Sequence, residues 1–188
     1  MKHAADERIA TVGSAADEQL DALDRVARAL DEIGADYWLY GGWAVDFHAG
    51  AVTRDHSDLD LAVWLGDLAR IAARLGDEGW VHQPSPDDDG GTAFVGHGVR
   101  LELAYLVRDD DGTIYTPHRE RRGRWSEEAL GADVRELDGV RVRVVSLMPL
   151  SRSKASARDD PVEAAKDNAD AETLVRVIAS ETPGEPAG

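Results

Sequence analysis

The sequence predicts an α/β (α+β) fold: a mixed β-sheet flanked by helices, with a small helical part toward the C-terminus. Helical and strand-like hydrophobic patterns alternate along the first half of the 188 residues, which favours helices packed on a sheet. Short strand patterns separated by glycine turns fill much of the second half, and helical patterns follow them. The length suits one main domain rather than two.

In the first half, helices and strands are expected in turn. Apolar residues recur every three or four positions at 14–33 and 66–80, and a short helix is expected at 43–50. Strand patterns rich in aromatic or branched side chains occupy 36–40 and 58–65. The expected order is therefore helix, strand, helix, strand, helix.

The second half begins with a loop rich in proline and aspartate at 83–91. Two strands are expected next, at 92–98 and 99–107, and a polar connection at 117–131 follows. An Asp-Gly pair lies between two runs that alternate valine with arginine, which predicts a hairpin at 134–147. Strands therefore dominate this part of the chain.

The C-terminal part is expected to contain two helices, broken near Pro161, and a disordered tail at 181–188. No internal repeat or linker pattern separates the predicted elements. We therefore expect an N-terminal extension at 1–14, a core at 15–147 and a small helical part at 148–180.

Composition excludes several classes of function. The absence of cysteine excludes disulfides, thiolate nucleophiles and cysteine-ligated metal. Neither a signal-peptide pattern nor a membrane-spanning apolar run is present, which predicts a cytoplasmic protein without a membrane partner. The net charge is −16, from 21 Lys and Arg against 37 Asp and Glu, so nucleic acid is not expected as a partner.

Two aspartates, Asp58 and Asp60, lie one residue apart in the strand predicted at 58–65. Side chains alternate faces along a strand, so both carboxylates are expected on one face while Leu59 and Leu61 point into the core. Aspartate is a poor strand residue, and neighbouring carboxylates repel each other unless a cation lies between them. The spacing favours a site for a hard divalent ion such as Mg²⁺ over a solvated strand edge.

Gly41 and Gly42 lie between a predicted strand and a predicted helix. Glycines at this point let backbone N–H groups approach an anion at a helix N-terminus, although a pair of glycines can equally form a simple turn. Mg²⁺ and amide donors are the two usual means of holding a polyphosphate. Together with the two aspartates, the glycines therefore predict a cradle for the phosphates of a nucleoside triphosphate.

Glu102 is the candidate for a third carboxylate. It lies between Leu101 and Leu103 in the strand predicted at 99–107, so its side chain is expected on the opposite face from theirs. Close to Asp58 and Asp60, such a side chain would complete a metal site or take a proton from an attacking hydroxyl. An outward-facing strand glutamate is the alternative, and the residues alone leave these readings open.

The stretch "YWLYGGWAVDFHAGAVTRDHSDLDLAV", residues 37–63, resembles the DNA polymerase β-like nucleotidyltransferase superfamily. Within it, the order Gly-Gly-Trp, Val-Asp, Gly, Arg, His and Asp-Leu-Asp is similar to the antibiotic-modifying branch, the lincosamide nucleotidyltransferases and aminoglycoside adenylyltransferases. The segments "VRLELAYLVRDDDGTIY" and "KDNAD" resemble the family's third-acid strand and a Lys-Asp-x-x-Asp element on a late helix. Relatives often have aspartate where Glu102 stands, and 117–130 has no evident counterpart.

The resemblance implies the polymerase β-like core and a metal-dependent transfer of AMP from ATP, or another nucleoside triphosphate, to a hydroxyl of a small cationic antibiotic. Asp58 and Asp60 would hold two Mg²⁺ ions, with Glu102 as third ligand, general base or both. Gly41 and Gly42 would hold the departing phosphates. The acceptor would be a lincosamide or an aminoglycoside, and the protein a monomer or a homodimer.

Five further polar residues extend this prediction. Arg54 and His56 are expected near the phosphates or the acceptor, and Lys154 near the triphosphate. Asp46 is expected to orient the loop by hydrogen bonding, and Lys166 to pair with acidic neighbours.

The aromatic residues Tyr37, Trp38 and Trp64 are expected either in the core or on the walls of a pocket. The basic segment at 119–124 is interrupted by glutamate and precedes Trp125, which favours a solvated loop or a lid over the nucleotide rather than a nucleic-acid surface.

Two other functions remain open at the level of sequence. The chain could be a catalytically silent homologue that only binds a ligand, because a fold does not guarantee activity. It could also transfer nucleotide to a protein hydroxyl, as toxin–antitoxin nucleotidyltransferases of similar fold do. The presence of Asp58, Asp60 and Glu102 together argues against a silent homologue.

Overall fold

The computed structural model describes residues 14–84, 90–117, 123–156 and 160–181. The predicted N-terminal extension, apart from residue 14, and nearly all of the predicted tail lie outside these ranges. So does most of the basic segment that precedes Trp125. Within the described ranges, no helix is long and apolar enough to cross a membrane.

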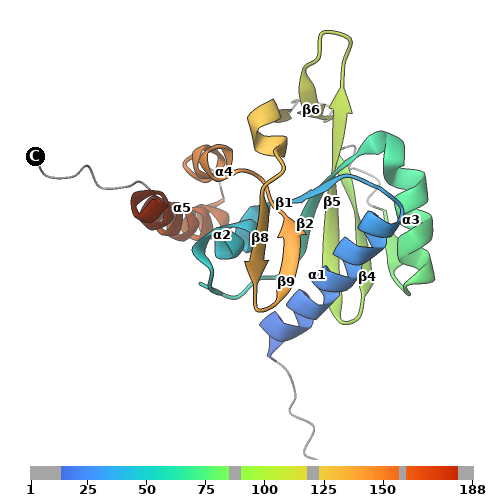
Figure 1. Cartoon of the computed structure of the whole chain (residues 1–188), viewed down its shortest axis with the longest axis horizontal. Coiled ribbons are helices and arrows are strands. Elements are labelled where there is room, and N and C mark those ends of the chain that lie inside the picture. Colours follow the sequence, from blue (N-terminus) through green and yellow to red (C-terminus); the bar gives the residue numbers. More distant parts are fainter. Residues whose placement is uncertain (1–13, 85–89, 118–122, 157–159, 182–188) are drawn as a thin grey trace, which may run out of the picture.

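The described residues form sixteen helical and strand elements (Figure 1). In chain order these are α1 (Ala15–Glu32), β1 (Tyr37–Leu39), α2 (Gly41–Ala49), β2 (Leu59–Trp64), η1 (Leu65–Asp67), α3 (Leu68–Asp77), β3 (Val81–Gln83), β4 (Gly91–Gly96), β5 (Val99–Arg108), β6 (Ile114–Thr116), β7 (Gly123–Trp125), η2 (Glu127–Leu130), β8 (Val134–Leu137), β9 (Val140–Arg143), α4 (Leu147–Lys154) and α5 (Pro161–Glu181). The predicted fold class is confirmed.

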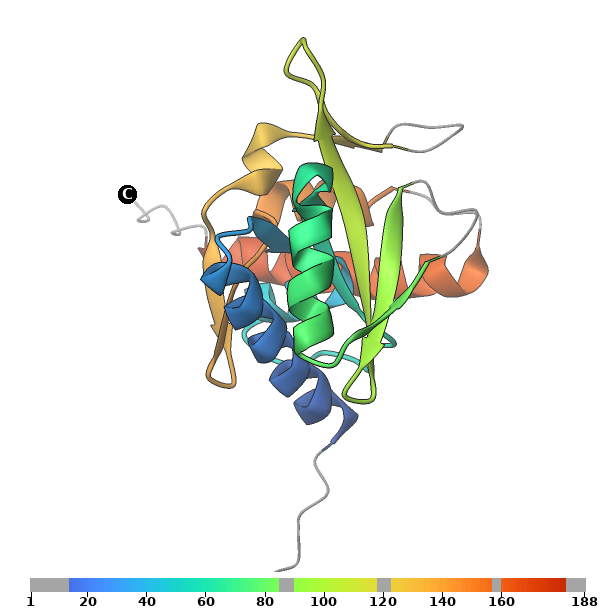
Figure 2. The same cartoon turned by 90° about the vertical axis from the view of Figure 1, so that its right-hand side faces the viewer.

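The main sheet is mixed, as predicted. Its strands lie in the order β1-β2-β5-β4-β3, and β6 and β7 continue the pairing from β5. β2 and β5 are parallel, whereas the other pairs are antiparallel. Figure 2 shows α1 and α3 side by side over one face of this sheet, with α5 behind it. β8 and β9 form the predicted hairpin as a separate two-stranded sheet.

The hydrophobic core lies between this sheet and its helices. Leu59 and Leu61 of β2 are fully buried, as are Leu23 and Leu30 of α1. Ser14 caps α1 together with Asp17 in a reciprocal capping box. The alternation along β2 therefore points leucines into the core and leaves Asp60 on the opposite face.

The aromatic residues of β1 and β2 belong mainly to this core. Tyr37 and Trp38 are buried, and Trp64 packs edge-on against Trp38 with ring centroids 6.2 Å apart. The side chains of these three residues do not line the cavity described below. Of the two roles that the sequence leaves open, the core role is the one observed.

Near the site, two expected element boundaries were wrong and one expected connection contains further elements. α2 begins at Gly41 rather than at 43, because Tyr40 is the extended N-cap and both glycines lie in the first turn. β2 begins at Leu59, so Asp58 lies just before the strand. The connection expected at 117–131 contains β7 and η2.

Short strands explain the last of these errors. β7 has three residues, too few to show a periodicity, and it exists because it pairs with β6. Trp125 Nε1–H also donates to Thr116 Oγ1 across that pair at 2.9 Å. The sequence likewise gave no expectation for β3, which has three exposed residues and pairs with β4.

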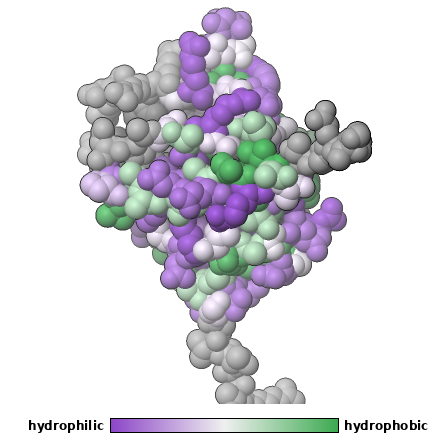
Figure 3. Space-filling model, turned by 90° about the vertical axis from the view of Figure 1, so that its left-hand side faces the viewer, coloured by the Kyte–Doolittle hydropathy of each residue, from purple (hydrophilic) through white to green (hydrophobic). Residues whose placement is uncertain are grey.

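α4 and α5 lie on the side of the molecule opposite to α3 (Figure 1). Figure 3 views this side, where hydrophilic side chains surround smaller apolar areas. Val162 and Val175 of α5 are exposed, whereas Asp167 and Asp170 are buried. The helix thus turns two carboxylates inward, the reverse of the usual arrangement.

His48 of α2 is buried and gives the fold a pH dependence. Its Nε2–H donates to the Val145 carbonyl oxygen at 2.8 Å, and burial lowers its pKa below the ordinary 6.5. The unfolded chain therefore takes up this proton at a higher pH than the folded protein does. The stabilising contribution is complete above the unfolded pKa and is lost as the pH falls through the lowered, folded value.

We expect the melting temperature to fall between about pH 7.5 and pH 5.5 more steeply for the unchanged protein than for a His48→Gln variant. The glutamine amide can still donate to Val145 but does not titrate. Differential scanning calorimetry over this range measures both curves. Parallel curves would contradict the assignment to His48.

Candidate active site

A cavity of about 870 Å³ lies between the sheet and the two C-terminal helices. All the residues that the sequence singles out for metal or nucleotide binding line it: Gly41, Gly42, Arg54, Asp58, Asp60, Glu102 and Lys154. They come from the start of α2, the loop before β2, the strands β2 and β5, and the end of α4. The fold thus brings together residues that are far apart in sequence.

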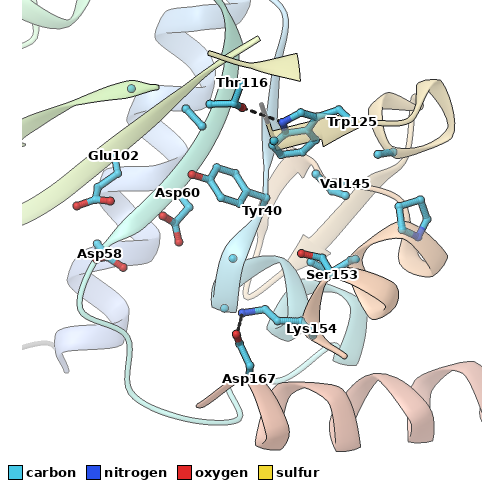
Figure 4. Close-up of a pocket in the computed structure, with 18 of the residues that line it drawn as sticks. Tyr40, Asp58, Asp60, Glu102, Thr116, Trp125, Val145, Ser153, Lys154 and Asp167 are labelled. Carbon is cyan, nitrogen blue, oxygen red and sulfur yellow. Dashed lines mark hydrogen bonds and ion pairs between the residues drawn. The ribbon is translucent and has the colours of Figure 1, made fainter. Parts of the chain in front are cut away.

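Three carboxylates form one wall of the cavity. Asp60 on β2 and Glu102 on β5 are direct partners across the parallel strand pair, so their side chains lie on the same face of the sheet. Asp58 lies just before β2 and also lines the cavity. Figure 4 shows the three side chains together on one side of the pocket.

Glu102 is already paired with a cation of its own strand. Arg100 Nε donates to Glu102 Oε1 at 2.8 Å, and both side chains are more than one third exposed. An exposed pair of this kind contributes little stability, on the order of 0.2–1 kcal/mol. Glu102 can therefore exchange Arg100 for another cation at small cost.

The donor chemistry of this wall fits a hard divalent cation such as Mg²⁺, which prefers carboxylate oxygen. Among the described residues, no three His, Asp or Glu side chains already form a metal-binding group. That is compatible with Mg²⁺ at a nucleotide site, because such ions usually take one or two carboxylates together with water and substrate phosphates. Full participation of Glu102 would require it to turn away from Arg100.

The two glycines make room for side chains of the site itself. A Cβ atom on Gly41 would lie 2.1 Å from Asp60 Oδ2, and one on Gly42 would lie 2.2 Å from Arg54 Nη2 and 2.7 Å from His56 Nδ1. Asp60 and Arg54 therefore rest against the first turn of α2. The sequence analysis explained the two glycines by the space that phosphates need. The structure adds a second reason, which is the close approach of Asp60, Arg54 and His56.

Asp46 orients the loop before β2, as predicted. It is fully buried, accepts a bond from Thr53 Oγ1, and accepts another from His56 Nε2–H at 2.6 Å. The His56 ring lies over Trp43, with centroids 4.4 Å apart. Gln19 joins them, because it donates to the His56 carbonyl and accepts from Trp43 Nε1–H.

Four charged side chains form a cluster at the cavity, in which Arg54 is partly buried and the other three are buried: Arg54, Lys154, Asp167 and Asp170. Arg54 forms two bonds to Asp170, and Lys154 Nζ lies 2.8 Å from Asp167 Oδ1 and 2.9 Å from Asp170 Oδ2. Lys154 is thus held at the cavity by Asp167 (Figure 4). Lys166 pairs with Glu163 at 2.8 Å, which confirms the expectation of an acidic neighbour.

Other residues of the site were not predicted. Tyr40 and Trp125 line the cavity and pack edge-on, with ring centroids 5.7 Å apart. The polar edge of Trp125 is bonded to Thr116, so its ring is held in place. Asp167 and Asp170 belong to the "KDNAD" segment, which the sequence singled out by its resemblance to a Lys-Asp-x-x-Asp element but without a role in the site.

Comparisons with known proteins identify the family of the chain. A family model described as aminoglycoside-2''-adenylyltransferase matches residues 22–173. Two 2''-aminoglycoside nucleotidyltransferases, from Escherichia coli and Klebsiella pneumoniae, are each 38% identical over 61 residues, which are 31% of this chain and 34% of each relative. The match thus spans about a third of the length of these relatives.

Two solved structures share the fold. The lincosamide antibiotic adenylyltransferase LnuA, with lincomycin bound, has a TM-score of 0.64 at 17% identity, over 86% of this chain and 96% of that chain. ANT(2'')-Ia in complex with adenylyl-2''-tobramycin has a TM-score of 0.58 at 20% identity, over 86% and 95%. The match to the family model confirms the predicted antibiotic-modifying branch of the nucleotidyltransferases. Because the family model covers the span from α1 to α5, the chain belongs to the aminoglycoside-2''-adenylyltransferase family.

Proposed function

We propose that the protein is a metal-dependent nucleotidyltransferase that moves AMP from ATP, or another nucleoside triphosphate, to a hydroxyl of a lincosamide or an aminoglycoside. The observation that carries the proposal is the carboxylate wall, in which Asp60 faces Glu102 across two parallel strands. This wall lies in the same cavity as the first turn of α2. Membership of the family supports the same reaction class.

In this proposal Asp58, Asp60 and Glu102 hold two Mg²⁺ ions. When bound, these ions would neutralise charge on the attacking and departing oxygens. The first turn of α2, at Gly41 and Gly42, receives the phosphates, because free backbone N–H groups at a helix N-terminus favour an anion.

The cations Arg54 and Lys154 flank these phosphates from the loop before β2 and from α4. Both are held by carboxylates of α5, so each would reach the phosphates from a fixed position.

Glu102 is the proposed general base as well as a ligand. Once released from Arg100, its carboxylate can accept the proton of the acceptor hydroxyl within the cavity. The partly buried aromatic pair Tyr40 and Trp125 gives the cavity a wall on which a flat ring can pack.

The acceptor is proposed to be a small, cationic molecule with a hydroxyl group. A net charge of −16 attracts cations and repels nucleic acids. The cavity volume of about 870 Å³ lies in the range of small-molecule sites. We propose that the protein works in the cytoplasm, where ATP is available, as a monomer or a homodimer.

The proposal is tested by pyrophosphate release from ATP and Mg²⁺ over a panel of lincosamides and aminoglycosides. We expect release with one of these drug classes and background release without a drug. Silence over the whole panel, with magnesium-dependent ATP binding retained, would contradict the antibiotic acceptor. A mass increase on a co-expressed protein would then indicate a protein hydroxyl as the acceptor. If the protein did not bind ATP in the presence of Mg²⁺, that result would indicate a catalytically silent protein.

A further inference from the structure

We propose that Asp170 of α5 is a positioning residue, which aims Arg54 at the N-terminus of α2 and thereby sets the affinity of the site for the triphosphate. The inference rests on the proposed function, because it concerns the same phosphate site. Asp170 lies 116 residues from Arg54 in the sequence. Its role would be to fix the direction of the cation rather than to touch the substrate.

The pair has the geometry of a fixed fork. Arg54 Nε donates to Asp170 Oδ1 at 2.9 Å, and Arg54 Nη2 donates to Asp170 Oδ2 at 3.0 Å. The Asp170 side chain is 2% exposed and that of Arg54 is 23% exposed. Two parallel bonds to a buried carboxylate fix the plane of the guanidinium, which a single bond would not do.

The fork leaves Arg54 directly against the first turn of α2. The clash that a Cβ atom on Gly42 would make, at 2.2 Å, is with Arg54 Nη2. Helix N-termini carry partial positive charge, so a cation placed there is repelled unless an anion is also present. Asp170 supplies part of that negative charge, and a bound phosphate would supply the rest.

A second cation, Lys154, helps to explain why the Asp170 carboxylate stays charged. Its Oδ2 also lies 2.9 Å from Lys154 Nζ. Burial alone would raise the pKa of Asp170, but the hydrogen bonds from Arg54 and Lys154 outweigh it and lower the pKa below the ordinary 3.8. At neutral pH the fork is therefore an ion pair.

α5 also offers a matched control. Asp167 lies three residues earlier, is similarly buried, and pairs with Lys154 rather than with Arg54. Asp167→Asn therefore removes a buried carboxylate from the same helix and leaves the Arg54 fork in place. Asp170→Asn removes the fork itself.

The test is a double-mutant cycle with Asp170→Asn and Arg54→Gln, in which calorimetry measures binding of ATP with Mg²⁺ and of adenosine. We expect each single substitution to raise the Kd for ATP by roughly 10-fold or more, as for a charge-assisted hydrogen bond. The double variant should be no weaker than Arg54→Gln alone, because Asp170 acts through Arg54. Adenosine binding should stay unchanged, and Asp167→Asn should weaken ATP binding less.

Arg54→Lys is a second test, for the case in which Asp170→Asn does not fold. Lysine keeps the positive charge at position 54 but cannot form the two parallel bonds to Asp170. It too should weaken ATP binding and spare adenosine. Fully additive losses in the cycle, or equal losses for ATP and adenosine, would overturn the positioning role. If the unchanged protein failed to bind ATP, the proposed function would fall together with this inference.

Discussion

Replacing Asp60 by asparagine is expected to reduce nucleotidyl transfer by at least about a thousandfold while the fold stays intact. Asp60 is the carboxylate of the central strand, and it lies between the first turn of α2 and its partner Glu102. Removing its charge takes away the main ligand for a cation that would act in the transition state. The loss should therefore appear in kcat, measured as antibiotic-dependent pyrophosphate release.

Asp77→Asn is the control for this substitution. Asp77 is exposed at the end of α3, and its side chain does not line the cavity. The chemical change is the same, so activity should remain within about twofold of the unchanged protein, as for most surface substitutions. Retention of turnover by Asp60→Asn would disprove the assignment of the carboxylate wall.

Gly41→Ala is expected to lower activity by about a hundredfold or more, because the new methyl group would displace the Asp60 carboxylate. The predicted contact, 2.1 Å from Cβ to Asp60 Oδ2, is shorter than any real Cβ contact. Gly41 also has φ +70°, so an L-residue there costs about 1–2 kcal/mol in backbone strain. Stability and activity should therefore both fall.

Gly50→Ala separates these two effects. Gly50 has φ +69° and caps the C-terminus of the same helix, but its Cβ would meet nothing within 4 Å. Thermal unfolding should show a similar loss of stability for both alanine variants, whereas only Gly41→Ala should lose activity. Equal activity in the two variants would mean that the position of Asp60 does not depend on Gly41.

The parts of the fold that could be predicted are those with a clear period. α1 and α3 show apolar residues every three or four positions, and β2 combines buried leucines with Asp60, so the helices, the strand and this carboxylate all follow from the pattern. β7 and β3 have three residues each and depend on partners elsewhere in the chain. No local pattern can reveal such strands.

The residues of the candidate site likewise fall into those that the sequence pattern singles out and those that only the fold reveals. Asp60 could be singled out because a charge is unusual in a buried strand, and Asp58 because it lies two positions before Asp60. The glycines could be singled out because they lie between a strand and a helix. The Arg54–Asp170 fork and the contact between Tyr40 and Trp125 could not, because they join segments that only the fold brings together. The reason for Gly41, its contact with Asp60, likewise requires the packing of α2 on β2.

The most direct test of the central claim is mass spectrometry of lincomycin and tobramycin after incubation with the protein, ATP and Mg²⁺, with the Asp60→Asn variant as the blank. We expect one of these antibiotics to gain the mass of one adenylyl group and pyrophosphate to appear in equal amount, whereas the blank should show neither. Unmodified antibiotics, with ATP still bound in the presence of Mg²⁺, would contradict the claim that this carboxylate wall transfers nucleotide to an antibiotic.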